Sequence, residues 1–489
     1  MISRSVPARS QLSSNLDFLM LCLVIVSGLV VDRSAGQQRS EPSATAGPLR
    51  IHPQNPRYFA DSTGKAVYLI GSHTWNNLVD MGRSHPPEAF DFEAYLDFLQ
   101  KHHHNFIRLW TWGSTRWDTR ANGRWGKPDF IHWAGPLPWA RTGPGLARDG
   151  LPRFDLTRFD EAYFHRLRSR VEAAQKRGIY VSVMLFEGWA LYHAYRRPEA
   201  NVGWGWESHP FHPANNIQGI NADSNGDGNG VEFYSLTDPK ITALQESYIR
   251  KVVDTVHDLD NVLFEVINEG GEPNWNAWVV RTVQEYERTL GKQHPVGLTG
   301  HGGQDLPGMM RTSCQWVSPG RRDGYGDDPP AWNGDRPSLL DTDHVYGIGG
   351  SVGWVWKAFT RGHNPLFMDP YDGSVLGSNE PRWEAIRQAL GTTRRLAERL
   401  DMARMQPLDR LSSTGYCLAD PERAFVVFVP DGNEVVLDLK DSAGSWRVEW
   451  WEPTQGQLSV EPPVGGGQQR RWTLPREAPL VLLLLRELP

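Results

Sequence analysis

The sequence predicts a (β/α)8 barrel followed by a small all-β sandwich domain. From about residue 66 to residue 402, short apolar stretches alternate with amphipathic stretches of helical period, which is the pattern of parallel strands and their covering helices. Polar or acidic residues follow almost every apolar stretch, and this is where a barrel carries its active site. After about residue 405, short apolar stretches separated by turn signals predict an antiparallel sandwich.

Eight strands are expected in the barrel, at residues 66–72, 105–110, 179–186, 261–267, 295–299, 314–317, 337–340 and 366–368. Helices are expected at residues 90–104, 160–177, 241–259, 278–290, 354–361 and 382–402. The longest insertion, residues 192–238, follows the third strand on the side where a barrel gathers its functional residues. Four strands of the sandwich are expected at residues 424–429, 434–439, 446–451 and 480–485.

The N-terminus has the pattern of a secretory signal peptide. Arg4 and Arg9 precede an apolar run over residues 18–31, and the small residues 34–36 follow it. The run is shorter than the ~20 residues of a membrane helix, so no stable membrane insertion is expected, with an uncleaved signal anchor as the alternative. The predicted domains are a signal peptide over 1–36, a linker over 37–49, the barrel over 50–403 and the sandwich over 404–489, in a secreted or periplasmic protein.

Charge and cysteine content exclude several classes of protein. The net charge of -6 argues against a nucleic-acid partner, because such binding depends on neutralising phosphates. Cys314 and Cys417 fall in different predicted domains and define neither a disulfide scaffold nor a zinc site.

The chain has 21 Trp, which either pack in cores or form platforms for sugar rings. Neighbouring Gly, Asn or charged residues favour a cleft lining for some of them: Trp75, Trp112, Trp189, Trp204 and Trp206.

The fourth predicted strand ends in the pair Asn268–Glu269, before Gly270 and Gly271. Period-two alternation places Glu265 and Glu269 on one face of this strand. A buried strand that carries a carboxylate to its C-terminal end predicts a catalytic acid, and an ordinary strand with a polar loop is the alternative.

Glycosidic bonds are usually cleaved by two carboxyl groups, so a second carboxylate is needed beside Glu269, the candidate acid/base. The seventh predicted strand ends in Asp341-Thr342-Asp343-His344 and offers two. Asp343 is the favoured nucleophile because it lies further toward the C-terminal face and precedes His344. Asp341 is the competitor, since both project to one face. Asn268 is the candidate group for the 2-hydroxyl of the sugar.

The run over 261–270 resembles that of the large clan of retaining glycoside hydrolases with (β/α)8 barrels. In that clan an Asn-Glu pair ends strand four, the Glu is the acid/base, and the nucleophile ends strand seven. An Arg on strand two supports the nucleophile, and Arg108 matches that place. An ion pair between Arg108 and Glu265 inside the barrel is an alternative that is compatible with this role.

Three segments, in order, resemble the apiosidase-like glycoside hydrolases, in which a barrel precedes a β-sandwich often labelled collagen-binding. They are residues 58–65 with 69–75, residues 261–270, and residues 446–453 with Gly456. The resemblance covers about residues 50–489 and implies release of sugar units from complex polysaccharides.

Other polar and aromatic residues at predicted strand ends are candidate substrate contacts: His73, Trp110, Glu187, His301, His344 and Asp369. Glu187 is also a rival acid because it ends a strand and precedes Gly188 and Trp189.

One loop has the first half of an EF-hand pattern, with Asp223, Asn225 and Asp227 at alternating positions and Gly228 at the sixth. Tyr234 stands where the terminal Glu is expected, and Glu232 comes two residues early. A structural calcium ion and a flexible polar loop are the two interpretations, and no cofactor is required for the reaction.

The leading hypothesis is a secreted glycoside hydrolase that cleaves a plant or bacterial polysaccharide by a retaining two-carboxylate mechanism. The alternative is a binding protein, in which a degenerate barrel holds a carbohydrate or the sandwich holds a matrix protein. Fold alone does not distinguish them.

Overall fold

The computed structural model describes residues 45–119, 131–195, 204–300 and 304–487. The predicted signal peptide, most of the predicted linker and His301 lie outside these residues. Among the described residues, no helix combines the length and the hydrophobicity of a membrane span.

The first part of the chain has a mixed α/β fold built on two parallel sheets. One has the strand order β14-β13-β12-β11-β6 and the other the order β15-β16-β4. In chain order these strands are β4 (Gly71–His73), β6 (Phe106–Leu109), β11 (Tyr180–Glu187), β12 (Val262–Asn268), β13 (Val296–Thr299), β14 (Trp316–Ser318), β15 (Leu339–Asp341) and β16 (Asn364–Met368). A parallel bridge between Val317 and Ser338 joins β14 to the chain before β15. At the opposite edges of the two sheets, β6 and β4 approach each other: the N–H of Asn105, just before β6, donates to the carbonyl of Ile70, just before β4, at 3.0 Å.

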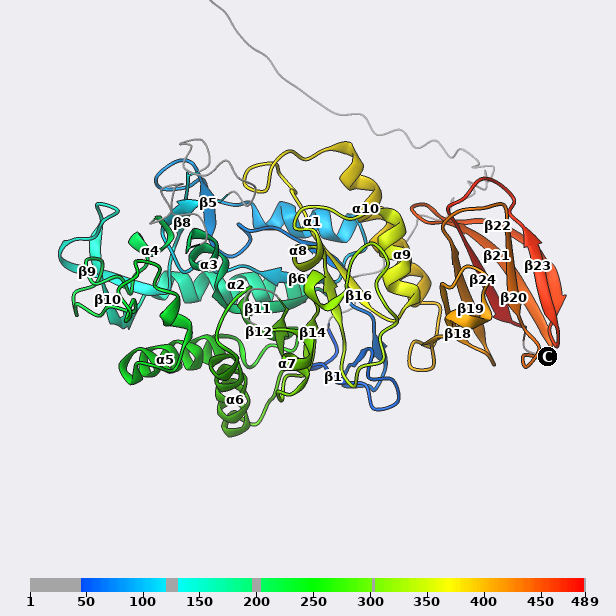
Figure 1. Cartoon of the computed structure of the whole chain (residues 1–489), viewed down its shortest axis with the longest axis horizontal. Helices are drawn as coiled ribbons and strands as arrows, with labels where there is room; N and C mark the ends of the chain where they lie inside the picture. The colour runs from blue at the N-terminus through cyan, green and yellow to red at the C-terminus, as the bar shows by residue number, and fades with distance from the viewer. Residues whose placement is uncertain (1–44, 120–130, 196–203, 301–303, 488–489) are drawn as a thin grey trace, which may run out of the picture. The chain divides into compact units, whose positions relative to one another are not determined.

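Helices lie between the parallel strands in sequence and around them in space (Figure 1). The longer ones are α1 (Phe92–Lys101), α2 (Glu161–Lys176), α5 (Pro239–Val256), α6 (Pro273–Leu290), α9 (Val352–Thr360) and α10 (Pro381–Ala397). They match the predicted helices to within a few residues. Asp91, Asp160 and Asp238 cap α1, α2 and α5 by accepting backbone N–H bonds, which explains where these helices begin.

The parallel strands share two layers of inward side chains. The lower layer is apolar and draws on both sheets: Leu69, Phe106, Tyr180, Leu263, Trp316, Leu339 and Leu366. On β13 the residue is Gly297, where a Cβ would lie 1.9 Å from the ring of Trp316. The second layer is charged. It contains Arg108, Glu265 and Asp341, each two residues further along its strand than a residue of the apolar layer and therefore on the same face. A charged layer therefore lies directly above an apolar one.

The first parallel strand begins later than the prediction. Ala66–Val67 forms β3 of a small antiparallel sheet with β1 (Arg50–Ile51) and β2 (Phe59–Ala60). The apolar run therefore crosses from one sheet into another, and β4 begins only at Gly71. A Cβ at Gly71 would lie 1.9 Å from the carbonyl oxygen of Phe106, so close strand approach requires glycine here.

Five further strands were not predicted from the sequence: β5, which precedes α1, and β7 to β10, which lie between β6 and α2. One sheet has the order β5-β8-β7, with β5 (Asp80–Gly82), β7 (Arg116–Asp118) and β8 (Ile131–Gly135). A hairpin of β9 (Trp139–Leu146) and β10 (Pro152–Phe159) follows. The insertion after β11 contains the short helices α3 (Trp189–Tyr195) and α4 (Trp204–Glu207). Short helices α7 (Leu306–Met310) and α8 (Thr342–Val345) follow β13 and β15.

The last part of the chain forms two antiparallel sheets, with orders β17-β18-β19-β24-β21-β22 and β20-β23. The strands are β17 (Gln406–Pro407), β18 (Cys417–Asp420), β19 (Ala424–Val429), β20 (Glu434–Asp438), β21 (Ser445–Glu452), β22 (Gly456–Gly465), β23 (Gln469–Thr473) and β24 (Leu480–Arg486). A separate apolar core, which includes Phe425, Trp446 and Trp450, lies among them. The four strands expected here are present.

Candidate active site

Arg108 is the centre of a buried ionic network at the C-terminal ends of the parallel strands. Its guanidinium donates from Nε and Nη2 to the two oxygens of Glu265, the Nε bond being 2.9 Å long. Nη2 also donates to Oδ1 of Asn268 at 2.6 Å. Nη1 lies 3.1 Å from Oδ2 of Asp341 and 3.0 Å from Oδ2 of Asp343. Arg108 therefore forms the predicted ion pair with Glu265 and also contacts both candidate nucleophiles, Asp341 and Asp343.

Asp341 has its acceptor positions taken by the protein. Its Oδ1 accepts the backbone N–H of Asp343 at 2.9 Å, which caps the short helix α8. Its Oδ2 lies 2.8 Å from Nε2 of His73 and 3.1 Å from Arg108. Burial alone would raise the pKa of Asp341, but His73 and Arg108 outweigh it and lower the pKa below its ordinary value. This carboxylate is fully buried and holds the chain that carries Asp343.

His73 and Trp110 form a support beneath this network. The indole N–H of Trp110 donates to Nδ1 of His73 at 2.9 Å. Because an indole nitrogen can only donate, Nδ1 is the acceptor and Nε2 carries the proton that faces Asp341. The Trp110 ring also lies 4.8 Å from the guanidinium carbon of Arg108. Trp110 is fully buried, so it contacts the network rather than the surface.

Glu269, Asp343 and His344 converge above Arg108. One carboxylate oxygen of Glu269, one of Asp343 and one ring nitrogen of His344 all lie within 4.8 Å of one another. His344 bonds through Nδ1 to Ser318 at 2.8 Å and through Nε2 to Oδ1 of Asn268 at 3.3 Å. The two carboxylates are thus the groups at this point that could take a cation or act on a substrate.

The protonation of Asp343 is sensitive to its neighbour. Burial, with a further contribution from the negative charge of Glu269, raises the pKa of Asp343 to about 7, although Arg108 acts in the opposite direction. A negative charge on Glu269 therefore favours the protonated form of Asp343.

The orientation of Asn268 follows from its partners. Its Oδ1 accepts from Arg108, which can only donate, so the amide nitrogen is the remaining group. Asn268 and Glu269 are both buried, with 1% and 4% of their surface exposed.

The backbone of Glu269 is left-handed, with a φ of 53°, which costs energy for a residue with a side chain. Gly188, at the end of β11, packs against this turn, and its N–H donates to the carbonyl of Asn268 at 2.8 Å. A Cβ at Gly188 would lie 2.8 Å from the carbonyl oxygen of Glu269 and 3.1 Å from that of Asn268. The ends of β11 and β12 therefore fit together only with glycine at this position.

Two more of the candidate substrate contacts, Glu187 and Asp369, also have structural partners. The carboxylate of Glu187 accepts the backbone N–H groups of Trp189 and Ala190 at the start of α3. Burial raises the pKa of Glu187 well above its ordinary value, and the charges of Glu269 and Asp343 act in the same direction. The carboxylate of Asp369 pairs with both Nε and Nη2 of Arg387 on α10.

The tryptophans expected to line a cleft are mostly buried. Trp75 lies 5.3 to 5.7 Å from the rings of Trp112, Trp117 and Trp189, and each of these four is at most 6% exposed. Trp206 is 4% exposed, and the side chain of Trp204 lies outside the described part of the chain. These rings pack on one another, so the expectation of a cleft lining is corrected for the described ones.

The supporting roles of Ser318 and Gly188 were not predicted. Ser318 ends β14, and the rule that polar residues at strand ends face the site could have identified it. For Gly188 the signal was only its place between Glu187 and Trp189.

The predicted calcium loop brings its acidic groups together. Oxygens of Asp223, Asp227 and Glu232 lie within 4.8 Å of one another, so Glu232 joins the cluster despite its early position. The amide nitrogen of Asn225 donates to Asp227 at 3.0 Å and to Glu232 at 2.7 Å. The calcium ion stays a prediction, and melting temperatures measured with Ca²⁺ and with a chelator test it, since an ion bound to the folded state raises the melting temperature.

Comparisons with known proteins agree with this architecture. A family model described as a domain of unknown function, DUF6298, matches residues 105–305, which include Arg108, Asn268 and Glu269. The comparison with curated proteins gives no match.

Solved structures match along most of the chain. A structure described as a glycoside hydrolase has a TM-score of 0.55 at 10% identity, covering 90% of this chain and 97% of its own. A glycoside hydrolase family 5 protein from Bacteroides vulgatus ATCC 8482 has a TM-score of 0.57 at 11% identity, covering 91% and 95%. Another structure from the same strain has a TM-score of 0.61 at 12% identity, covering 93% and 84%. Identities this low concern the fold alone. The chain therefore has the mixed α/β fold of glycoside hydrolases similar to family 5.

Proposed function

We propose that this protein is a secreted retaining glycoside hydrolase that acts on a complex plant or bacterial polysaccharide. The observation that carries the proposal is the close approach of Glu269 and Asp343 above Arg108, within 4.8 Å. Carboxyl groups of retaining enzymes are ~5–5.5 Å apart, whereas inverting enzymes need ~6.5–9.5 Å to admit a water. The resemblance to apiosidase-like enzymes, and with it the release of sugar units, belongs to the same proposal.

The proposal includes a closed (β/α)8 barrel and a C-terminal β-sandwich domain. Closure is supported by the apolar layer that both parallel sheets share and by the backbone bonds at their two junctions. The sandwich is supported by the apolar core among the antiparallel strands. Export rests on the N-terminal sequence pattern.

In the proposed reaction, Glu269 donates its proton to the glycosidic oxygen as the bond to the anomeric carbon breaks. Asp343 attacks that carbon and forms a covalent glycosyl-enzyme. Glu269, now ionised, takes a proton from a water molecule, whose oxygen attacks the same carbon. The sugar leaves with its anomeric configuration retained, and Asp343 returns as a carboxylate.

Asp343 is a better nucleophile than Asp341 because of its contacts. Asp341 is fully buried and both of its oxygens are held, Oδ1 by the N–H of Asp343 and Oδ2 by His73 and Arg108. Asp343 has 7% of its side chain exposed and lies beside Glu269. The amide nitrogen of Asn268 would donate to the 2-hydroxyl of the sugar, a bond that strengthens in the transition state.

The test measures sugar release from a panel of polysaccharides by the wild type, Glu269→Gln, Asp343→Asn and Glu272→Gln. The last is a matched control, because Glu272 is an exposed carboxylate close in sequence to Glu269. Losing the acid/base should lower the rate about 10²–10⁴-fold, and the control should retain activity. NMR of the first product gives its anomeric configuration, and an inverted product contradicts the pairing. Binding to a polymer without any release favours the alternative, a carbohydrate-binding barrel.

A further inference from the structure

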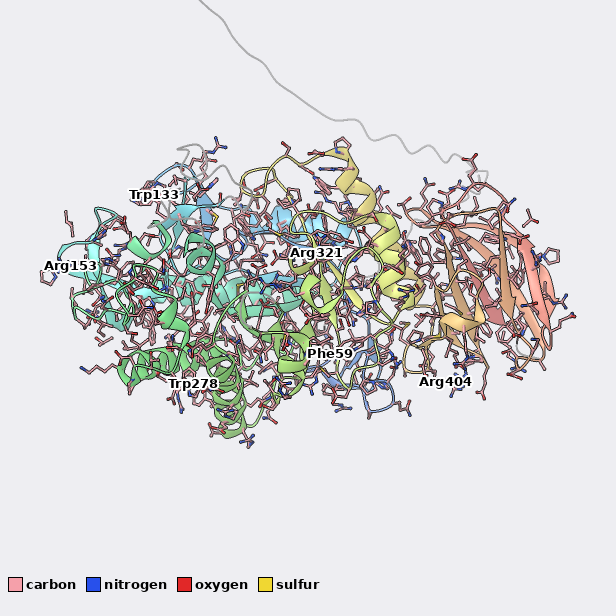
Figure 2. All side chains as sticks on the ribbon, in the orientation of Figure 1. Phe59, Trp133, Arg153, Trp278, Arg321 and Arg404 are labelled. Carbon is pink, nitrogen blue, oxygen red and sulfur yellow. The ribbon has the colours of Figure 1, made fainter. Side chains whose placement is uncertain are left out.

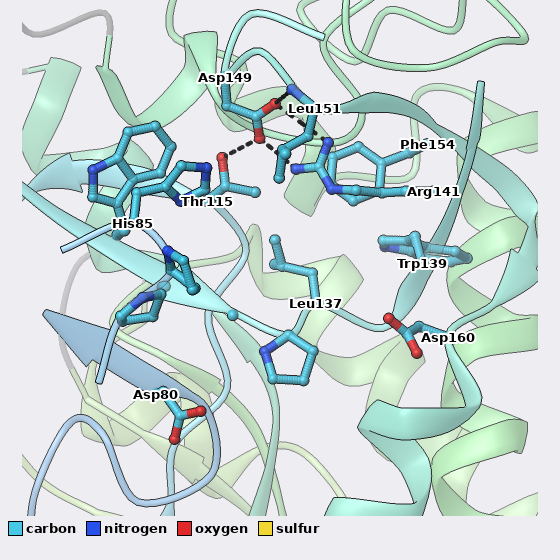
Figure 3. A pocket seen from close by; sticks show the side chains of 16 residues that line it. Asp80, His85, Thr115, Leu137, Trp139, Arg141, Asp149, Leu151, Phe154 and Asp160 are labelled. Atoms are coloured by element: carbon cyan, nitrogen blue, oxygen red, sulfur yellow. Dashed lines mark hydrogen bonds and ion pairs between the residues drawn. The ribbon is translucent and has the colours of Figure 1, made fainter. Parts of the chain in front are cut away.

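A pocket with a volume of about 310 Å³ is lined by β5 and the turn after it and by the segment between β6 and α2 (Figure 3). Its size is at the lower end of the range for small-molecule sites. The residues that line it include none of Arg108, Glu269 and Asp343. It is therefore distinct from the candidate active site.

The sheet β5-β8-β7 forms one wall of this pocket. Strand alternation puts Trp133 and Gly135 of β8 on the pocket face and His132 on the other. Trp117, which pairs with His132, packs on Trp75 and Trp189, at 5.7 and 4.9 Å between ring centroids. The sheet therefore lies between the pocket and the buried tryptophan cluster next to the strand ends.

The walls of the pocket are built from stacked side chains. Trp133 is half-buried: the exposed His85 ring stacks on it, with ring centroids 3.8 Å apart and an angle of 20° between the planes, and the guanidinium carbon of Arg116 lies 4.9 Å from the same ring. Across the pocket, the guanidinium of Arg141 covers the ring of Phe154 at 3.9 Å. Leu137 lies between the two sides (Figure 3). The surfaces left for the C–H face of a sugar ring are the exposed His85 ring, which Trp133 supports, and Leu137.

The polar groups at the pocket are fixed and nearly balanced in charge. Asp149 pairs with Arg141 and accepts bonds from the Thr115 hydroxyl at 3.0 Å and the Leu151 N–H at 3.1 Å. Asp80 and Asp160 lie on the opposite side in Figure 3. Asp80 pairs with Arg166 at 2.8 Å, and Asp160 caps α2. Two of the three carboxylates thus have an arginine partner, which favours a neutral ligand rather than a charged one.

We propose that this pocket is a second carbohydrate-binding site, which holds one neutral sugar ring of a polymer. A sugar ring has C–H faces for Leu137 and for the His85 ring that Trp133 supports, and hydroxyl groups for Asp149, Arg141 and Asp160. The kind of polymer expected here rests on the proposed function, whereas the binding itself is inferred from this pocket. Such a site would keep a long chain on the enzyme between cleavage events.

The test uses binding without turnover, in the Glu269→Gln background. Native gels that contain galactomannan, xyloglucan or polygalacturonate report affinity as a loss of mobility. Trp133→Ala removes one wall. Gly135→Leu places a larger side chain on the pocket face, where an added Cβ would meet no atom within 4 Å. Trp278→Ala is the matched control, a half-buried tryptophan of α6 at another place on the surface (Figure 2).

Both pocket variants should weaken binding of a neutral polymer about tenfold, while the control binds as the parent does. Unchanged binding by both variants overturns the inference. So does a parent that binds only polygalacturonate, or none of the polymers. With Glu269 intact, Trp133→Ala should still cleave a small aryl glycoside at the wild-type rate. If the wild type releases no sugar, the proposed hydrolase fails, and the gels still decide the second site.

Discussion

At the scale of residues, the site is organised by one guanidinium. Arg108 touches Glu265, Asn268, Asp341 and Asp343, and each of these comes from the C-terminal part of a parallel strand or the turn after it. A buried arginine is stable only when its donors are paired, and here all are directed at oxygens. Through these contacts Arg108 holds the end of β12, which precedes Glu269, at a fixed distance from the turn after β15, which carries Asp343.

The pairing of Arg108 predicts a large loss of stability in Arg108→Leu. The change leaves Glu265 buried without its cation, and breaking such a pair costs about 3–5 kcal/mol. Chemical denaturation of this variant and of Arg250→Leu gives the comparison. Arg250 is exposed and pairs with Glu246 on one helix, so its loss should cost no more than about 0.5 kcal/mol. Equal losses in both variants would contradict a buried network.

The elevated pKa of Asp343 predicts the pH dependence of activity. As a nucleophile Asp343 must be ionised, so kcat/KM should fall as the pH drops through about 7. Glu269→Gln removes a negative charge that raises this pKa, and the acidic limb should move to lower pH. The rate of this variant can be measured on an aryl glycoside with a good leaving group, because such a substrate does not need the proton that Glu269 would donate. An acidic limb that stays in place in Glu269→Gln would refute the coupling.

At the scale of elements, the contact between the ends of β11 and β12 sets the direction of the Glu269 side chain. Gly188 allows the approach, and the left-handed backbone of Glu269 follows from it. Residues in sparsely populated backbone conformations are typical of functional sites, because the surrounding structure must hold them.

Gly188→Ala should displace Glu269, since the new methyl would press on a backbone oxygen. A shift of this kind can cost about 10²-fold in rate. The loss should be larger for substrates with poor leaving groups, which need the acid, than for activated ones. Gly326→Ala serves as the control, because its Cβ would meet no atom within 4 Å. Equal slowing of both substrate types would mean a general loss of structure.

The order of the elements could be predicted from the sequence, because parallel strands and amphipathic helices have different periods. Arg108, Asn268, Glu269, Asp341 and Asp343 were also identified, since each lies in or just after a predicted strand. Asp343 was favoured over Asp341 as the nucleophile, but the contacts that separate the two could not be predicted. That Asp341 supports Asp343 depends on a backbone bond, and the strands β5 and β7 to β10 are too irregular for a period to appear.

At the scale of the whole molecule, the parallel and antiparallel parts share contacts. The indole of Trp356 on α9 donates to the carbonyl of Pro453 at 3.0 Å. Arg399, just after α10, pairs with the buried Glu449 of β21 at 2.9 Å. One apolar cluster includes Phe359, Phe428 and Trp451, from both parts.

These shared contacts predict that the two parts unfold together. Calorimetry should give one transition for the full chain. A chain that ends at residue 403 should melt at a lower temperature and lose solubility, because it exposes Trp356 and its apolar neighbours. This experiment also tests the predicted boundary between residues 403 and 404. Two separate transitions, or an unchanged melting temperature after truncation, would show independent domains.

The layer around Arg108 holds three carboxylates, those of Glu265, Asp341 and Asp343, against one guanidinium. In the proposed reaction, this excess of negative charge would stabilise the positive charge that develops on the sugar as the glycosidic bond breaks. The same attraction should make the candidate active site selective among inhibitors. A sugar mimic with a protonated ring nitrogen carries a permanent positive charge that these carboxylates attract. Iminosugars should therefore inhibit more strongly than uncharged lactones of the same shape.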